Sequence, residues 1–149
     1  MNTEQPILLV EDNATDVLLI RRAMARASVR NPIHVASDGD LAVAYLAGEM
    51  PYTDRQRYPL PGLVLLDLKL PKRSGHEVLG WLKTQPQLAR IPVIVLSSSR
   101  LPADVNGAYD RHANSYLVKP VQFDDLQRII EAVQGFWISK AEPPLVGEN

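Results

Sequence analysis

Short, continuous apolar runs separated by longer amphipathic stretches constrain the fold of this chain more than any other feature. The runs at Ile7–Val10, Leu63–Leu66 and 92–96 contain no polar residue, and two weaker runs lie at Ile33–Ala36 and Ser115–Val118. Continuous apolar strands are typical of a parallel sheet covered on both faces, because a strand with one face in water alternates apolar and polar residues. The pattern therefore predicts five buried, parallel strands.

Each run is followed by a stretch whose apolar residues recur three and four positions apart, as on one face of a helix. We expect helices over 16–27, 40–47, Gly75–Thr84, 103–113 and 124–137. Gly107 weakens the fourth by about 1 kcal/mol relative to alanine. Strands that alternate with helices pair in parallel through right-handed crossovers. The chain is therefore predicted to be α/β, with a doubly wound parallel sheet.

Composition narrows the class of protein. The chain has 149 residues, which predicts one domain, over 1–138, with a C-terminal tail at 139–149 that we expect to be flexible. Lys and Arg number 16 against 17 Asp and Glu, so no basic field favours nucleic acid as a partner. Without cysteine, a thiol nucleophile is excluded. No apolar run approaches the roughly 20 residues that span a membrane, so we expect a cytoplasmic protein with no membrane partner.

Polar side chains stand where the predicted strands end. The first strand is followed by Glu11 and Asp12, the third by Asp67, the fourth by Ser97 and the fifth by Lys119. In doubly wound sheets, ligands bind beyond the carboxyl ends of the strands. Clustered carboxylates repel one another, and a divalent cation would offset that repulsion. Ligands that are all oxygen favour magnesium, manganese or calcium over zinc.

These residue types together indicate phosphoryl transfer. Asp67 is the candidate nucleophile, since carboxylates form aspartyl-phosphates. Lys119 supplies a compact positive charge for the transferred group, and the Ser97 hydroxyl is placed to bond a phosphoryl oxygen. We expect the protein to phosphorylate itself from an external donor and then to hydrolyse the bond, and we do not expect an enzyme that turns over other substrates.

At these residues the sequence resembles the response-regulator receiver domains of two-component signalling. The motifs that carry the resemblance are LLVEDN at 8–13, LLDLKLP at 65–71, VLSS at 95–98 and VKP at 118–120. The resemblance implies a flavodoxin-like (βα)5 fold with strand order 2-1-3-4-5. It also implies Mg²⁺-dependent phosphorylation of Asp67 by a sensor histidine kinase, with Mn²⁺ as a possible substitute.

The resemblance also assigns roles to single residues. It implies that Glu11, Asp12 and Asp67 hold the metal together with the backbone carbonyl of Lys69. Ser97 becomes the switch hydroxyl, where threonine is common, and Lys119 the phosphoryl contact. The same likeness makes Tyr116 a switch aromatic, and it implies a cis Lys119–Pro120 bond.

A narrower resemblance is to the small stand-alone regulators paired with phytochrome-type kinases. It rests on 109–116, on Phe136 and Trp137, and on the long connection at 51–61. It implies a protein without an output domain that forms homodimers through its last helix. Phe136, Trp137 and Ile138 cannot all face one helical stripe, and the apolar surplus suggests a partner surface.

Several of these residues also have a purely structural interpretation. Glu11 and Asp12 suit the start of a helix through its dipole, and Tyr116 suits a half-buried strand. Ser97 suits a loop or cap. His112 is expected to be structural, at the end of a helix, with Asn114 as a left-handed cap.

Three other functions are alternatives to that of a phosphorylated receiver. A degenerate receiver used only as a scaffold would have no reason to bind Mg²⁺. A phosphatase of the haloacid-dehalogenase type needs a second acid two residues after the nucleophile, where this chain has Lys69. A dinucleotide-binding enzyme needs a glycine-rich turn after the first strand, and residues 11–14 contain no glycine.

Overall fold

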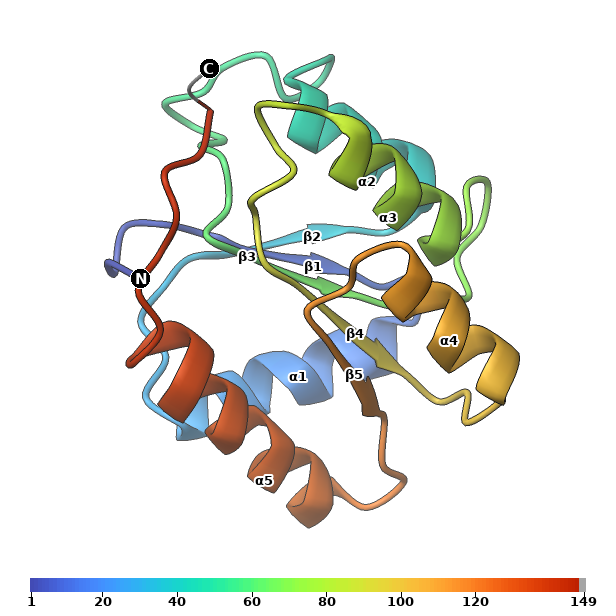
Figure 1. Ribbon diagram of the computed structural model, residues 1–149. Helices are drawn as coiled ribbons and strands as arrows, with labels where there is room; N and C mark the ends of the chain where they lie inside the picture. Colours follow the sequence, from blue (N-terminus) through green and yellow to red (C-terminus); the bar gives the residue numbers. More distant parts are fainter. Residues whose placement is uncertain (148–149) are drawn as a thin grey trace.

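A computed structural model describes residues 1–147 and shows a parallel sheet between two layers of helices (Figure 1). The sheet has five strands in the order β2-β1-β3-β4-β5, and every neighbouring pair is parallel. The strands are β1 (Ile7–Val10), β2 (Ile33–Ala36), β3 (Leu63–Leu66), β4 (Val93–Ser97) and β5 (Ser115–Val118). The predicted doubly wound α/β fold and its strand order are confirmed.

The helices divide between the two faces of this sheet. One face carries α1 (Ala14–Arg26) and α5 (Phe123–Val133), which contact each other. The other face carries α2 (Gly39–Ala47), α3 (Gly75–Thr84) and α4 (Pro102–Asp110). Each of the five predicted helices is present, with ends that differ from the expected ones by up to four residues.

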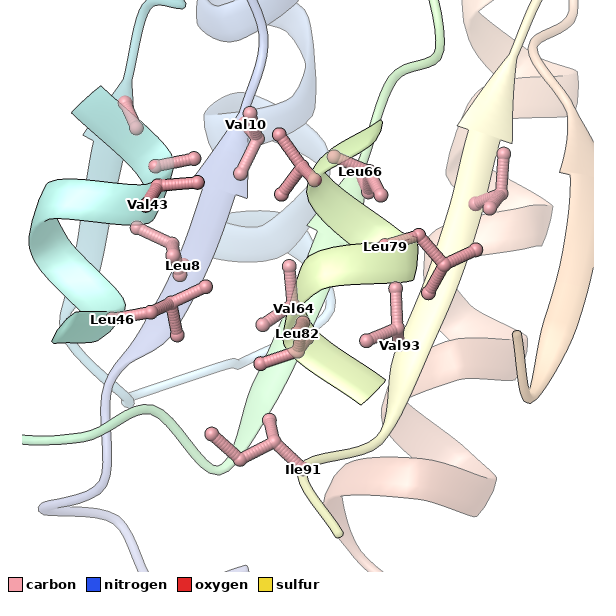
Figure 2. Close-up of a cluster of buried hydrophobic side chains, with 14 of the residues drawn as sticks. Leu8, Val10, Val43, Leu46, Val64, Leu66, Leu79, Leu82, Ile91 and Val93 are labelled. Carbon is pink, nitrogen blue, oxygen red and sulfur yellow. The ribbon is translucent and has the colours of Figure 1, made fainter. Parts of the chain in front are cut away.

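Alternate residues of each central strand point into one of two cores, which explains why these strands are apolar up to their carboxyl ends. Leu8 and Val10 of β1 pack under α2 and α3 in the core drawn in Figure 2. Ile7 and Leu9 pack against α1 and α5 on the opposite face. All four side chains are almost fully buried. Burial of one such side chain contributes about 1.5–3 kcal/mol, so the two cores fix the register of the sheet.

Local capping sets the beginnings of the helices at the carboxyl edge of the sheet. Asn13 caps α1 by accepting a hydrogen bond from the amide of Asp16. Ser74 and Glu77 form a reciprocal capping box at α3. Such caps are worth about 1 kcal/mol each, and they fix where the chain leaves each strand. The loops that follow β1 and β3, which carry the acidic residues, are therefore held at both ends.

Two helix ends differ from the predictions. The helix expected over 124–137 leaves α-geometry after Val133 and continues as a π-helical turn over Gln134–Ile138. This turn buries Ile138 and leaves Phe136 58% exposed. After α4, His112 adopts the left-handed conformation with φ of 69°, and Asn114 does not. The side chain of Asn114 instead accepts a hydrogen bond from the amide of Val93, which fixes the start of β4.

The connection at 51–61 is an irregular loop, as its sequence predicts. The rings of Tyr52 and Tyr58 contact the ring of the buried Tyr45, and the Arg55 guanidinium donates to the carbonyls of Tyr45 and Leu46 at the end of α2. The loop therefore supplies hydrogen-bond donors to carbonyls in the last turn of the helix.

Part of the C-terminal tail contacts the rest of the protein, and its flexibility stays a prediction. Val146 packs against the core under α2 and α3, and the amide of Gly147 donates to the carbonyl of Gln87 at 2.9 Å. Residues 148 and 149 of the predicted tail lie outside the described residues. Over 1–147, every helix is too short or too polar to cross a membrane.

Candidate phosphoryl-transfer site

Three acidic side chains converge at the carboxyl edge of the sheet. Glu11 and Asp12 follow β1, and Asp67 follows β3, its direct neighbour in the sheet. One carboxylate oxygen from each of the three lies within 4.8 Å of the others. Glu11 is 2% exposed and Asp67 8%, whereas Asp12 faces solvent. The convergence that the strand ends predict is confirmed.

The donor set fits a hard divalent cation. All three side-chain donors are carboxylate oxygens, the ligands that Mg²⁺ and Mn²⁺ prefer. Glu11, Asp12 and Asp67 can therefore hold such a cation. The carbonyl of Lys69, in the loop that follows Asp67, stays a prediction.

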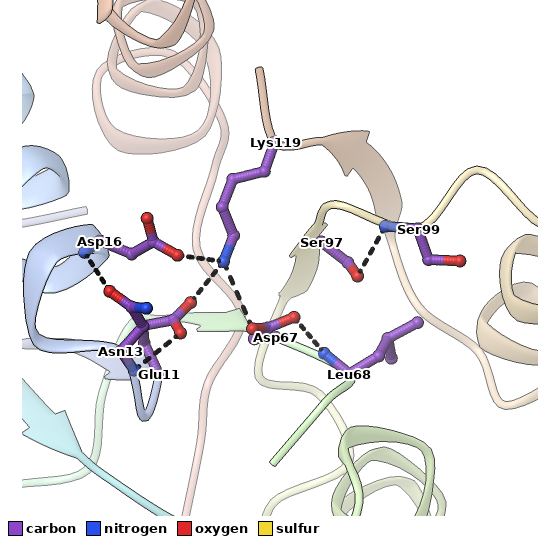
Figure 3. A network of polar contacts seen from close by, with 8 residues as sticks. All are labelled: Glu11, Asn13, Asp16, Asp67, Leu68, Ser97, Ser99 and Lys119. Carbon is purple, nitrogen blue, oxygen red and sulfur yellow. Dashed lines mark hydrogen bonds and ion pairs between the residues drawn. The ribbon is translucent and has the colours of Figure 1, made fainter. Parts of the chain in front are cut away.

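The amine of Lys119 lies among the carboxylates (Figure 3). Its Nζ is 2.7 Å from Oε2 of Glu11, 3.3 Å from Oδ2 of Asp67 and 3.0 Å from Oδ2 of Asp16. Lys119 itself is only 11% exposed. The predicted meeting of Lys119 with Asp67 is confirmed, and the contact with Asp16 was not foreseen. Asp16 lies in the first turn of the helix after β1, at the same sheet edge as Lys119, and this position in the sequence could have indicated the contact.

Burial and mutual contact change the acidities of this cluster. Burial raises the pKa of Glu11 to about 7, with the charge of Asp67 adding to the rise and the hydrogen bond from Lys119 opposing it. Burial alone would lower the pKa of Lys119, but its hydrogen bonds with Glu11 and Asp16 outweigh this and raise it above its usual value. Lys119 is therefore a fixed cation in the site.

Asp67 is oriented by two contacts on its two oxygens. The amide of Leu68 donates to Oδ1 at 2.7 Å, and Oδ2 faces Lys119. The following loop is packed closely, since a Cβ on Gly75 would lie 2.3 Å from the carbonyl oxygen of Asp67. This close approach to the backbone requires glycine at position 75.

The predicted switch residues Ser97 and Tyr116 both contact Ser99, a residue that the sequence alone does not assign to the site. Ser97 is fully buried, and its hydroxyl accepts a hydrogen bond from the amide of Ser99. The hydroxyl of Tyr116 donates to the carbonyl of Ser99 at 2.8 Å, and the Ser99 hydroxyl bonds the carboxylate of Asp104 on α4. Ser97 and Tyr116 thus contact the same loop residue, and their roles in switching stay predictions.

One expectation at this edge is wrong. The Lys119–Pro120 peptide bond is trans, and among the described residues the single cis bond is Met50–Pro51. Trans is the default for such bonds by about 0.5–1 kcal/mol, and the trans chain already delivers the amine of Lys119 to its three partners.

A parallel five-stranded sheet that carries an acidic cluster, a central aspartate and a buried lysine at its carboxyl edge defines a receiver domain. The family model of the response regulator receiver domain matches residues 7–131, and the chain belongs to this family.

Several relatives are similar over nearly the whole chain. The probable methanogenesis regulatory protein FilR2 of Methanothrix harundinacea is 41% identical over 97% of this chain and 92% of its own. The phosphorylated cyanobacterial phytochrome response regulator RcpA superposes with a TM-score of 0.88 at 41% identity, covering 95% of this chain and 99% of that one.

The response regulator Rcp1 of Synechocystis, whose structure was solved in an Mn²⁺-bound form, gives a TM-score of 0.86 at 36% identity over 94% of this chain and 99% of that one. The chain is thus related to phytochrome response regulators, as the narrower resemblance implies.

Proposed function

We propose that this chain is a stand-alone response regulator that accepts a phosphoryl group on Asp67 from a sensor histidine kinase. The observation that carries the proposal is the setting of Asp67, whose Oδ2 lies 3.3 Å from the amine of Lys119 within the acidic cluster. Phosphoryl transfer needs an aligned nucleophile and positive charge for the transferred oxygens, and both are provided here.

In the proposed reaction, a P–O bond forms to the Asp67 carboxylate as the P–N bond of the phosphohistidine breaks. The bonding electron pair leaves on the imidazole nitrogen. Lys119 holds positive charge beside the acceptor, and the amide of Leu68 orients the carboxylate. A divalent cation held by Glu11, Asp12 and Asp67 would neutralise negative charge on the phosphoryl oxygens.

The signal is proposed to pass through Ser97 and Tyr116. The Ser97 side chain turns to donate its hydroxyl to the new phosphoryl oxygen, and this movement carries Oγ away from the amide of Ser99. Because Tyr116 bonds the carbonyl of the same residue, a shift at Ser99 changes the surroundings of Tyr116 and of Asp104 on α4. Such a switch is a two-state equilibrium biased by the phosphoryl contacts.

The test is incubation with acetyl phosphate and Mg²⁺, followed by intact-mass measurement. We expect one added phosphoryl group, absent without Mg²⁺ and absent in Asp67→Asn, which has nearly the same shape. The control Asp125→Asn removes an exposed carboxylate of α5 and should be modified like the wild type. A wild-type protein that stays unmodified would contradict the proposal and favour a scaffold. Continuous turnover of an aryl phosphate would favour a phosphatase instead of self-catalysed transfer and hydrolysis.

A phytochrome-type kinase is proposed as the donor, in the cytoplasm. The support is the similarity to RcpA and Rcp1 over nearly the full length of both chains. Phosphotransfer profiling against candidate histidine kinases tests it. We expect the fastest transfer from a phytochrome-type kinase, and equal or faster transfer from unrelated kinases contradicts it.

We also propose a homodimer that uses the end of the chain around α5. Phe136 is 58% exposed and makes an edge-to-face contact with Trp137, with ring centroids 5.2 Å apart, so an apolar pair is presented at the surface. Light scattering with and without acetyl phosphate measures assembly. We expect a dimer that Phe136→Ser weakens, and a monomer at high concentration in both states contradicts it.

A further inference from the structure

Three carboxylates surround the Lys119 amine, and they are not equivalent. Glu11 and Asp67 belong to the cluster whose oxygens can hold a divalent cation, whereas Asp16 lies outside that cluster. An ammonium group has three N–H donors, and these three acceptors can occupy all of them. Among residues 1–147, Asp16 is thus the one acidic partner of Lys119 that a bound cation does not share.

Asp16 is held in place by the fold. It lies in the first turn of α1, and its amide donates to the side chain of Asn13, the residue that caps the helix. Its side chain is 34% exposed and reaches the amine of Lys119 at 3.0 Å (Figure 3). The contact joins the start of α1 to the end of β5, more than 100 residues later in the chain.

Cation binding changes the surroundings of Lys119. With a divalent ion bound, the oxygens of Glu11 and Asp67 would be engaged as ligands and would be poorer acceptors for the amine. The ammonium would also be repelled by the added positive charge, strongly so because the site is largely buried. Without a further negative charge, Lys119 would be displaced toward solvent when the cluster is loaded.

We propose that Asp16 is a positioning residue that holds the Lys119 amine beside Asp67 while a divalent cation occupies the cluster. That the positioned amine serves to contact a phosphoryl group rests on the proposed function. The placement of the Lys119 amine by Asp16 is independent of that function.

The direct test observes the Lys119 ammonium by ¹⁵N NMR during an Mg²⁺ titration, with Lys119→Arg used for assignment. In the wild type and in Asp125→Asn, we expect a slowly exchanging signal that persists to saturating Mg²⁺. In Asp16→Asn, exchange with water should become several-fold faster on adding Mg²⁺, and Asp16→Glu should recover part of the protection. An unchanged backbone amide spectrum outside α1 separates this effect from misfolding.

Two results overturn the proposal. One is an Asp16→Asn signal as protected as that of the wild type at saturating Mg²⁺. The other is a wild-type signal that is absent or is lost on adding Mg²⁺, because the amine is then not held.

A kinetic measurement with phosphoramidate, which needs no kinase contact, adds the functional consequence. At saturating Mg²⁺ and donor, Asp16→Asn should be phosphorylated about tenfold more slowly, as for the loss of one charged hydrogen bond, and Asp16→Glu should recover part of the rate. An unchanged maximal rate contradicts a role in the reaction. If the wild type is not phosphorylated at all, the proposed function fails, while the NMR result still decides the placement of Lys119 by Asp16.

Discussion

The amine of Lys119 lies 2.7 Å from Oε2 of Glu11, although 108 residues separate them in the chain. Glu11 follows β1 and Lys119 follows β5, so the lysine side chain reaches past the ends of β4 and β3 to make this contact. The path passes Asp67, which follows β3. The ion pair therefore spans the centre of the site and places positive charge beside the carboxylate that we propose to be phosphorylated.

Mg²⁺ should stabilise the folded protein, because the cluster of Glu11, Asp12 and Asp67 exists only in the native state. At one hundred times the dissociation constant, the free energy of unfolding should rise by about 2.7 kcal/mol. Asp12→Asn should need a several-fold higher Mg²⁺ concentration for the same gain, and Asp125→Asn should not. Thermal melts across an Mg²⁺ titration measure this, and a melting temperature independent of Mg²⁺ would contradict the metal site.

Lys119→Met should destabilise the metal-free protein. It leaves Glu11 and Asp67 buried without a cation, and removing one partner of a buried ion pair costs about 3 kcal/mol. Saturating Mg²⁺ should recover more stability in this variant than in the wild type. Urea unfolding with and without Mg²⁺ measures both effects, with the exposed Lys140→Met as control. Equal stability and an equal Mg²⁺ increment would show that the lysine is not compensating these charges.

Two glycines of α3 should respond in opposite ways to alanine. A Cβ on Gly75 would lie 2.3 Å from the carbonyl oxygen of Asp67, so Gly75→Ala must shift the loop that carries the acceptor. We expect a loss of roughly 2 kcal/mol together with weaker Mg²⁺ binding. A Cβ on Gly80 meets nothing nearer than 3.8 Å, so Gly80→Ala should stabilise the helix by up to about 1 kcal/mol. Urea unfolding and calorimetry compare the pair, and similar effects of both changes would refute the close approach at Gly75.

Stability should fall steeply in alkali because of Tyr45. Burial raises the pKa of Tyr45 from its ordinary value near 10 to about 12, so the native state binds its proton more tightly than the unfolded chain does. The contribution of the protonated Tyr45 to the free energy of unfolding is fully present below pH 10 and is lost as the pH rises to 12. The loss amounts to roughly 2–3 kcal/mol.

Tyr45→Phe provides the comparison for that prediction. The change removes a hydrogen bond to the carbonyl of Pro59, which costs about 1 kcal/mol at neutral pH. It should also flatten the fall in stability between pH 10 and 12. Urea unfolding at several pH values measures the slope for each protein. Parallel slopes would mean that another group causes the alkaline loss.

Much of the fold and site could be predicted from local pattern. Apolar runs such as Leu63–Leu66 mark strands buried on both faces, and the amphipathic stretches between them impose parallel pairing. Because parallel strands end at one edge, a residue that follows a strand, such as Asp67 or Lys119, is assigned to the site without knowledge of any distance.

Other features depended on contacts between distant segments, and no local pattern encodes them. In the sequence Asp16 is an ordinary acidic residue in a first helical turn, and only the reach of the Lys119 side chain from the end of β5 brings the two together. Ser99 becomes a meeting point because the hydroxyl of Tyr116 reaches its carbonyl from the neighbouring strand.

The sequence by itself determined which segments are buried and which side chains stand at the functional edge, because burial pattern and chain direction are local properties. The tertiary structure decided which carboxylates the Lys119 amine meets, that the bond after it is trans and that His112 takes the left-handed turn. Those outcomes are set by side-chain reach and packing between elements far apart in the chain, where differences of about 1 kcal/mol select one arrangement.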